Sequence, residues 1–164
     1  MGSPAATYRP DIDGLRAIAV LGVVFCHVGI GLPGGYVGVD VFFVISGYLI
    51  TKIIATDIEK GTFSLGNFWL RRIRRIVPAL SAMTIATLIA GYFILLPDSY
   101  ESLGKSVIAL VLLSSNILFW RQINYFAPEG TEKPLLHTWS LAVEEQFYLL
   151  FPILIFFLIT KRRA

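Results

Sequence analysis

Apolar residues in this chain form five long runs, separated by short polar or glycine-rich stretches. Each run has about 18–22 residues, which at 1.5 Å per helical residue is enough to cross a hydrocarbon core of roughly 30 Å. The pattern predicts transmembrane helices at residues 15–32, 36–56, 76–96, 103–120 and 139–160. The predicted fold class is therefore all-α, a polytopic transmembrane helix bundle of about five helices.

The composition favours the same class. Of the 164 residues, 55% are hydrophobic and 15% are charged, and the mean hydropathy is +0.71. Soluble domains are typically about 45–50% apolar and about 25% charged. A soluble fold of this size could not bury so much apolar surface, so we expect a bilayer around the chain and membrane lipid among its partners.

Positive charge gathers in two clusters. The net charge is +3, and the basic residues concentrate at Arg71, Arg72, Arg74 and Arg75 and again at residues 161–163. Both clusters adjoin apolar runs, where membrane proteins place their cytoplasmic lysines and arginines. This placement argues against a nucleic-acid partner, and residues 161–164 form a predicted basic tail.

The same charges predict an orientation. The connector that contains Lys60 and the arginine cluster is expected in the cytoplasm, and the acidic turn at residues 97–102 is expected outside. Counting back through two helices places the N-terminus in the cytoplasm. Counting forward places residues 161–163 outside, although basic residues of membrane proteins gather on the cytoplasmic side. Three explanations stay open: a late segment is re-entrant, packing outweighs the charges, or the fourth segment is not a full span.

Arg16 and His27 are the most informative ionisable pair. Eleven residues bring a helix back to within about 20° of the same face, with the two side chains about 16 Å apart along the axis. The planar guanidinium of arginine suits a phosphate, and histidine can take a proton from a hydroxyl at neutral pH. The alternative is that Arg16 is a positive-inside anchor and His27 an interhelix contact.

Three carboxylates lie in the predicted spans. Asp40 follows the turn after His27 and could orient the imidazole or pair with a basic residue. Alternatively, its carboxylate could be solvated and unpaired at the level of the lipid headgroups. Glu144 and Glu145 are consecutive, so at most one points squarely into the bundle, where it can pair with an arginine. The catalytic candidates are His27, Arg16, Asp40 and Glu145.

The arginine cluster can hold phosphates. On a helix Arg72 and Arg75 share a face, and Arg71 shares one with Arg74 and with Arg75. Such a cluster can clamp a polyphosphate or anionic lipid headgroups, or can serve only as a topology anchor. No metal set is evident, because the two histidines are 110 positions apart with scattered acids between them.

Four motifs, in order, are similar to those of acyltransferase family 3, the membrane O-acyltransferases of bacterial surface polysaccharides. They are residues 8–17 (YRPDIDGLRA) with ten residues between Arg16 and His27, residues 38–48 (GVDVFFVISGY), the Arg-x-x-Arg element at Arg72 and Arg75, and residues 136–148 (LHTWSLAVEEQFY). The resemblance covers residues 8 to about 158, and it corresponds to the N-terminal half of the family's membrane domain.

The resemblance implies an enzyme that transfers an acyl group other than an amino-acyl group. The donor would be cytoplasmic acyl-CoA, commonly acetyl-CoA, and the acceptor a hydroxyl of a surface polysaccharide or lipid-linked sugar. Arg16 and His27 would be the essential pair, and Arg72 and Arg75 would support donor binding. We expect Arg71 and Arg16 to join them at the coenzyme A phosphates, His27 to act as general base, and the protein to lie in the bacterial inner membrane.

The resemblance also frames the domain organisation. Residues 1–7 are interpreted as a disordered start or a cloning remnant, residues 8–160 as the N-terminal part of the transmembrane acyltransferase domain, and residues 161–164 as the tail. The family's membrane domain has about ten helices, so missing C-terminal helices or a second chain are expected partners, and the fragment could be inactive alone. The alternative functions are a transporter-like module and a non-catalytic membrane fragment that retains the family signature.

Overall fold

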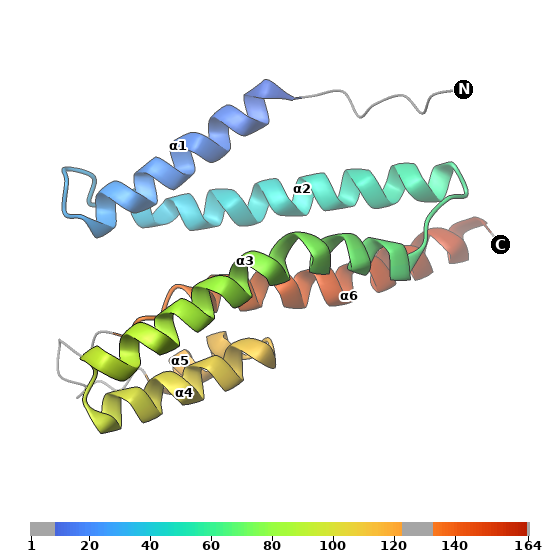
Figure 1. Cartoon of the computed structure of the whole chain (residues 1–164). Coiled ribbons are helices and arrows are strands. Elements are labelled where there is room, and N and C mark those ends of the chain that lie inside the picture. Colours follow the sequence, from blue (N-terminus) through green and yellow to red (C-terminus); the bar gives the residue numbers. More distant parts are fainter. Residues whose placement is uncertain (1–8, 123–132, 164) are drawn as a thin grey trace. The chain divides into compact units, whose positions relative to one another are not determined.

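The computed structural model describes residues 9–122 and 133–163, and this part of the chain is helical with no strand. The predicted disordered start at residues 1–7 and part of the predicted loop before the last helix lie outside it. The helices of this part are α1 (Pro10–His27), η1 (Gly35–Val37), α2 (Gly38–Glu59), α3 (Leu65–Ile94), α4 (Pro97–Val111), α5 (Ser115–Gln122) and α6 (Thr138–Arg163). Figure 1 labels the six α-helices among them. The all-α prediction is confirmed.

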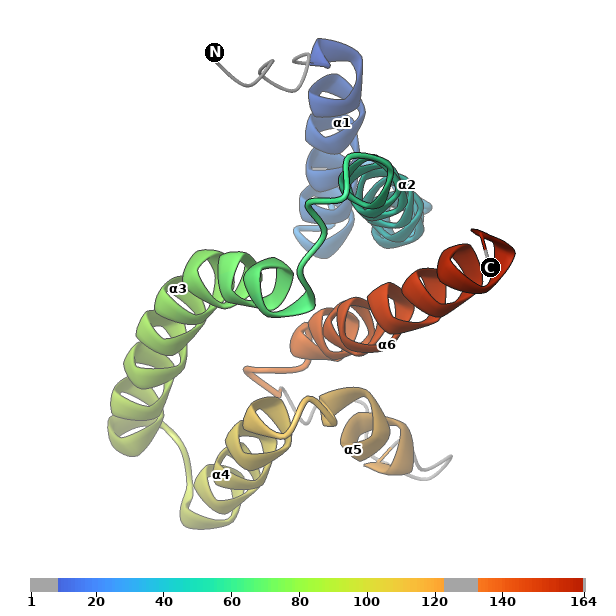
Figure 2. The same ribbon diagram turned by 90° about the vertical axis from the view of Figure 1, so that its right-hand side faces the viewer.

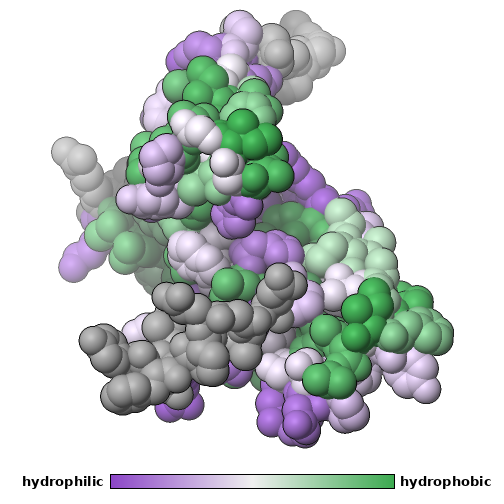
Figure 3. Space-filling model, turned by 90° about the vertical axis from the view of Figure 1, so that its left-hand side faces the viewer, coloured by the Kyte–Doolittle hydropathy of each residue, from purple (hydrophilic) through white to green (hydrophobic). Residues whose placement is uncertain are grey.

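Three of the described helices are long and apolar enough to cross a membrane: Gly35–Glu59, Leu65–Ile94 and Thr138–Leu158. Each contains most of one predicted span, at residues 36–56, 76–96 and 139–160, although α3 begins eleven residues before its predicted span. Large apolar side chains lie exposed around them, including Phe93 and Ile94, which are each 78% exposed. Patches of hydrophobic side chains are also visible at the surface, between hydrophilic ones, in Figure 3. Such exposure suits lipid and not water, so the chain is a helical membrane protein.

The chain folds as two compact units, residues 1–56 and residues 57–164. In the first unit, α1 begins with Pro10 at its first turn, where the missing N–H is harmless, and with Asp11 and Asp13 at the positive end of the helix dipole. The prediction that this helix spans 15–32 is wrong. It ends at His27, because Gly29 and Gly31 adopt the left-handed backbone conformation that stops a helix.

Two glycines, Gly35 of η1 and Gly38 at the start of α2, lie directly against α1. A Cβ atom on Gly35 would lie 2.0 Å from the carbonyl oxygen of Gly22, and one on Gly38 would lie 2.4 Å from that of Ala19. No side chain larger than hydrogen fits at either place. Close backbone approach of this kind is a common way of joining helices in lipid, where apolar burial alone gives little driving force.

In the second unit, α3 and α6 run in opposite directions (Figure 1). The Ser64 side chain caps α3 by accepting a hydrogen bond from the Asn67 backbone N–H, at 3.4 Å. The arginine cluster and the predicted third span belong to this one continuous helix. The rings of Phe63 and Phe156 lie 5.9 Å apart, so the start of α3 and the end of α6 are neighbours.

The prediction of one helix at residues 103–120 is wrong. The chain breaks after α4 at residues 112–114, where Leu113 has a φ of 53°, and α5 then turns back (Figure 2). At 15 and 8 residues, α4 and α5 are about 22 Å and 12 Å long, and each is short of a roughly 30 Å hydrocarbon core. The break is stabilised from α6, because the Gln146 side chain donates a hydrogen bond to the Leu113 carbonyl at 2.7 Å.

This break brings the end of α6 to the same end of the second unit as the start of α3 (Figure 1). Since α4 and α5 fold back on each other, α6 starts near the end of α3 and runs back to its beginning. The helix continues to Arg163, so residues 161–163 of the predicted tail are helical. They lie at the same end of the unit as the arginines of α3. The structure thereby favours the explanation in which the fourth apolar segment is not a full span.

Candidate functional site

His27 is the last residue of α1 and its side chain is exposed. Its Nδ1 atom lies 2.8 Å from the backbone carbonyl oxygen of Val23, one turn earlier. A carbonyl only accepts hydrogen bonds, so Nδ1 donates, and in the neutral ring Nε2 carries the lone pair. The local helix thus presents Nε2 as the basic nitrogen, which is the form a general base needs.

Arg16 lies on the same helix, eleven residues before His27. Its Nη1 atom is 3.9 Å from the Asp13 Oδ1 atom, and both side chains are about half exposed. An exposed ion pair of that length contributes little to stability. Arg16 therefore keeps its charge available for another anion, and its predicted role in catalysis and donor binding stays a prediction.

Arg9 and Asp11 form a second pair at the start of α1. The guanidinium donates through Nε to Asp11 Oδ1 at 2.8 Å and through Nη2 to Oδ2 at 2.6 Å. This bidentate hydrogen bond lowers the pKa of Asp11 to about 2. Asp11, with Asp13, keeps negative charge at the helix N-terminus, where it is favourable.

Asp40 is the third residue of α2 and its side chain is exposed. In the described part of the chain it makes no hydrogen bond or ion pair. The partner of His27 Nδ1 is the Val23 carbonyl, so the local helix, and not Asp40, orients the imidazole in this structure. A catalytic role for Asp40 stays a prediction.

The four arginines of α3 have different surroundings. Arg72 is half-buried, and its guanidinium carbon lies 4.6 Å from the ring centre of Tyr148 and 5.8 Å from that of Phe68. Arg71 is exposed and its Nη2 atom lies 3.7 Å from Asp57 Oδ2. Arg74 and Arg75 are exposed. Only Arg72 is held inside the unit, so the predicted cluster is one positioned arginine beside three surface arginines.

The facing side of α6 supplies carboxylates. The hydroxyl of Tyr148 donates a hydrogen bond to Glu144 Oε1. Glu145 is half-buried and lies within electrostatic range of Arg72 and Glu144. Its Oε1 atom is buried and has no hydrogen-bond partner in the described residues. The structure thus brings Glu145 and Arg72, two predicted site residues, into one neighbourhood.

Trp69 joins α3 to α6 through a backbone carbonyl. Pro152 lies four residues after Tyr148 and has no N–H, so it leaves the Tyr148 carbonyl without its helical partner. The indole Nε1 atom of Trp69 donates to this oxygen at 3.2 Å. Because Trp69 and Arg72 are three residues apart on α3, the same contact fixes Arg72 opposite the Tyr148 ring.

Gln146 and Asn116 are polar residues that the sequence patterns passed over. The Asn116 Nδ2 atom donates to Gln146 Oε1 at 3.2 Å, and Gln146 Nε2 lies 3.1 Å from Asn116 Oδ1. Ser115 donates to the Thr138 carbonyl at 2.9 Å. The run Ser114, Ser115, Asn116 within an apolar segment was the available signal, since these residues compete for backbone hydrogen bonds and favour breaks and caps.

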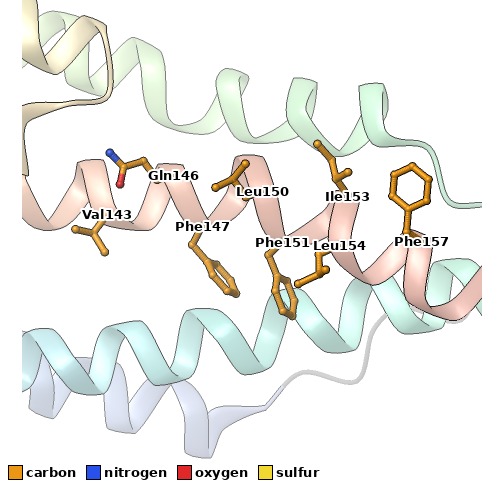
Figure 4. A pocket seen from close by; sticks show the side chains of 8 residues that line it. All are labelled: Val143, Gln146, Phe147, Leu150, Phe151, Ile153, Leu154 and Phe157. Carbon is orange, nitrogen blue, oxygen red and sulfur yellow. The ribbon is translucent and has the colours of Figure 1, made fainter.

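A groove of about 680 Å³ runs along α6 (Figure 4). All of its lining residues come from this helix, and all but Gln146 are apolar: Val143, Gln146, Phe147, Leu150, Phe151, Ile153, Leu154 and Phe157. The rings of Phe147 and Phe151 stack at 4.4 Å. The groove is thus an apolar face of α6.

Comparison with known proteins gives a consistent family. Residues 9–164 match the family model described as an acyltransferase domain. The chain is 44% identical over 148 residues to peptidoglycan O-acetyltransferase OatA of Listeria monocytogenes, covering 88% of this chain and 24% of that protein. It is 42% identical over 157 residues to O-acetyltransferase OatA of Staphylococcus aureus, covering 94% of this chain and 26% of that protein.

A putative O-acetyltransferase of Staphylococcus aureus is 41% identical over 153 residues, covering 90% of this chain and 25% of that protein. No solved structure matches the chain significantly. The chain thus spans about a quarter of the length of these curated relatives. The family match extends over nearly all of its residues, and the chain therefore belongs to acyltransferase family 3.

Proposed function

We propose that the chain is part of a membrane O-acyltransferase that moves an acetyl group from acetyl-CoA to a hydroxyl of a cell-envelope carbohydrate. Family membership and the names of its relatives support the acyl-transfer chemistry. The observation that carries the proposal is His27, whose Nδ1 atom is tied to the Val23 carbonyl. This contact leaves Nε2 basic, at the end of the helix that also carries Arg16.

In the proposed reaction, Nε2 of His27 takes the proton of the acceptor hydroxyl as the oxygen attacks the thioester carbonyl. A carbon–oxygen bond forms, the carbon–sulfur bond breaks, and coenzyme A leaves as a thiolate. The imidazolium formed on His27 can return the proton to that thiolate. Asp40 and Glu145 are the carboxylates proposed to take part in catalysis, and Arg16, about 16 Å from His27 along α1, is proposed to act by holding the donor.

The donor is proposed to bind through arginines. Coenzyme A carries a pyrophosphate and a further phosphate, and arginine binds such oxyanions bidentately. Arg72 is the positioned anchor, and the exposed Arg71 and Arg75 supply additional charge, with Arg16 as the contribution from α1. No metal is needed for this step, because the leaving thiolate is already stable.

We propose a bacterial inner-membrane protein with a cytoplasmic N-terminus. The basic end of the second unit, with the α3 arginines and residues 161–163, would face the cytoplasm, in agreement with the distribution of lysine and arginine in membrane proteins. The α4–α5 pair would be re-entrant from the outer side. Exposed arginines such as Arg74 would meet anionic lipid headgroups.

The acceptor proposed first is peptidoglycan, because the Listeria relative carries that substrate in its name; other surface polysaccharides and lipid-linked sugars are the alternatives. The apolar groove on α6 would be covered by further helices of the same protein or by a second copy of the chain. The length of the relatives, of which the chain covers about a quarter, supports this part of the proposal.

The test is acetyl transfer by the purified chain in lipid nanodiscs, with labelled acetyl-CoA and muramyl glycan fragments. We expect transfer by the unmodified chain and at least a hundredfold loss in His27→Ala and His27→Gln. The matched control is His137→Ala, which changes the other, exposed histidine and should retain transfer. Transfer that survives in His27→Ala would remove the general base. A chain that binds acetyl-CoA but transfers nothing would support the non-catalytic alternative.

A further inference from the structure

Tyr148 is the aromatic face against which Arg72 rests. The tyrosine is 3% exposed and lies on α6, and the guanidinium carbon of Arg72 lies 4.6 Å from its ring centre. Cations within about 6 Å of a ring centre are attracted to its face, most strongly where water is excluded. Phe68, which is 2% exposed and one turn before Arg72 on α3, adds a second ring at 5.8 Å.

A stacked guanidinium keeps its hydrogen-bond donors available. Stacking occupies the flat face of the group, while its five N–H donors point outward in the plane. In the described part of the chain, Arg72 makes no hydrogen bond, and no carboxylate oxygen lies within the 4.0 Å of an ion pair. Within the described residues, the N–H donors of Arg72 therefore have no hydrogen-bond acceptor, although the side chain is half-buried.

The ring of Tyr148 is fixed at both ends. Its carbonyl accepts a hydrogen bond from the indole N–H of Trp69 at a position where Pro152 supplies no backbone N–H, and its hydroxyl donates to Glu144. Trp69 belongs to the same face of α3 as Arg72. The contact that joins the two helices thus also sets the angle of the ring on which Arg72 rests.

We propose that Tyr148 is a positioning residue for the donor site: its ring holds the Arg72 guanidinium so that the N–H edge receives a phosphate of coenzyme A. This inference rests on the proposed function, and it adds a residue to which the sequence patterns assigned no role. The competing role is purely structural, in which Tyr148 only joins α3 to α6.

The test is the dissociation constant of the purified chain for coenzyme A, measured by calorimetry, with inorganic pyrophosphate as a second probe. Tyr148→Leu should weaken coenzyme A binding about 5- to 30-fold, the range expected when a desolvated cation–π contact is lost. Tyr148→Phe keeps the ring and should restore binding to within about twofold. The matched control is Tyr92→Leu, on an exposed tyrosine of α3 whose ring contacts Phe93 and Tyr100.

Coupling separates positioning from a structural role. In an Arg72→Lys background, Tyr148→Leu should change the dissociation constant less than twofold, because the stacked fork is already gone. An equal weakening in both backgrounds, or none in either, would overturn the proposal. If Tyr148→Leu unfolds, as judged by circular dichroism, Tyr148→Met serves as the variant that fills the site without a ring.

The two probes distinguish this proposal from the proposed function. Binding of pyrophosphate that depends on Tyr148 and Arg72, without binding of coenzyme A, would support the positioning role and contradict the acetyl-CoA donor. If coenzyme A binds equally well with and without the Tyr148 ring, the result would support acetyl-CoA as the donor and overturn the positioning role of Tyr148. Binding of neither probe would overturn both.

Discussion

The two compact units join their helices by different means. In residues 1–56, η1 and the start of α2 meet α1 through backbone against backbone, at Gly22 with Gly35 and at Ala19 with Gly38. In residues 57–164, side chains bridge to carbonyls that a regular helix would have used. Trp69 reaches the Tyr148 carbonyl beside Pro152, and Gln146 reaches the Leu113 carbonyl at the break.

The difference has a physical reason. In lipid, helices associate by close packing of small residues or by interhelical hydrogen bonds, because apolar burial gives little net gain there. The first unit uses the former and should be sensitive to side-chain size. The second unit contains broken helices, whose free carbonyls must be satisfied inside the protein. It should be sensitive to the loss of particular donors, and the following substitutions test this contrast.

The largest effect is expected for Gly35→Ala. Its Cβ atom would lie 2.0 Å from the Gly22 carbonyl oxygen, so the helices must separate, at a cost of about 1–3 kcal/mol or more. Thermal unfolding in detergent should show a lower Tm. The control is Gly47→Ala on α2, where a Cβ meets nothing within 4 Å, and a helical Gly→Ala change there is neutral or stabilising. Equal behaviour of the two variants would contradict the close-packing account.

Next is Gln146→Leu, which fills the same space without a donor. It leaves the Leu113 carbonyl without the hydrogen bond at 2.7 Å, and an unsatisfied buried group costs about 1–3 kcal/mol. The graded comparison is Asn116→Ala, which removes the amide partner of Gln146 but spares that bond, and which should cost less. A larger loss in Asn116→Ala than in Gln146→Leu would show that the break is held by something else.

Trp69→Phe should cost about 1 kcal/mol, since one interhelical hydrogen bond in lipid is worth about that much. Pro152→Ala supplies a backbone N–H to the Tyr148 carbonyl, so it should remove the need for the indole. The expected result is therefore a double-mutant cycle in which Trp69→Phe destabilises the chain less when residue 152 is alanine. Additive effects would argue against the carbonyl explanation.

The smallest effect concerns pH. The Arg9 guanidinium lowers the pKa of Asp11 from its ordinary 3.8 to about 2, so the carboxylate stabilises the folded chain above pH 4. That contribution is lost as the pH falls from about 4 to about 2, because the unfolded chain takes up the proton first. The Tm difference between the unmodified chain and Asp11→Asn should shrink over this window. A constant difference would contradict the pairing.

The membrane helices could be predicted where hydrophobicity alone decides. The spans at residues 36–56, 76–96 and 139–160 agree with α2, α3 and α6, since an apolar run of this length satisfies its backbone only as a helix. The α4–α5 break could not be predicted in the same way. Residues 112–114 contain neither glycine nor proline, and their conformation depends on Gln146, which is more than thirty positions away in sequence.

The candidate site also has one part that could be predicted from the sequence and one part that could not. The motif residues Arg16, His27 and Arg72 could be selected from the sequence, because charges in apolar runs are costly and few. Their surroundings could not: the partner of His27 is the Val23 carbonyl, and the partner of Arg72 is a ring 76 positions later in the chain. Tyr148 could not be selected, since an aromatic residue in an apolar run carries no signal of the cation beside it.

The central claim is that donor binding and base catalysis reside on different residues, Arg72 of the second unit and His27 of the first. The most direct test is the dissociation constant for acetyl-CoA of the unmodified chain, His27→Ala and Arg72→Ala, each in the same nanodiscs. We predict that His27→Ala binds within about twofold of the unmodified chain and that Arg72→Ala binds at least about tenfold more weakly, the equivalent of 1.4 kcal/mol. Equal affinities in all three, or a loss confined to His27→Ala, would contradict this assignment.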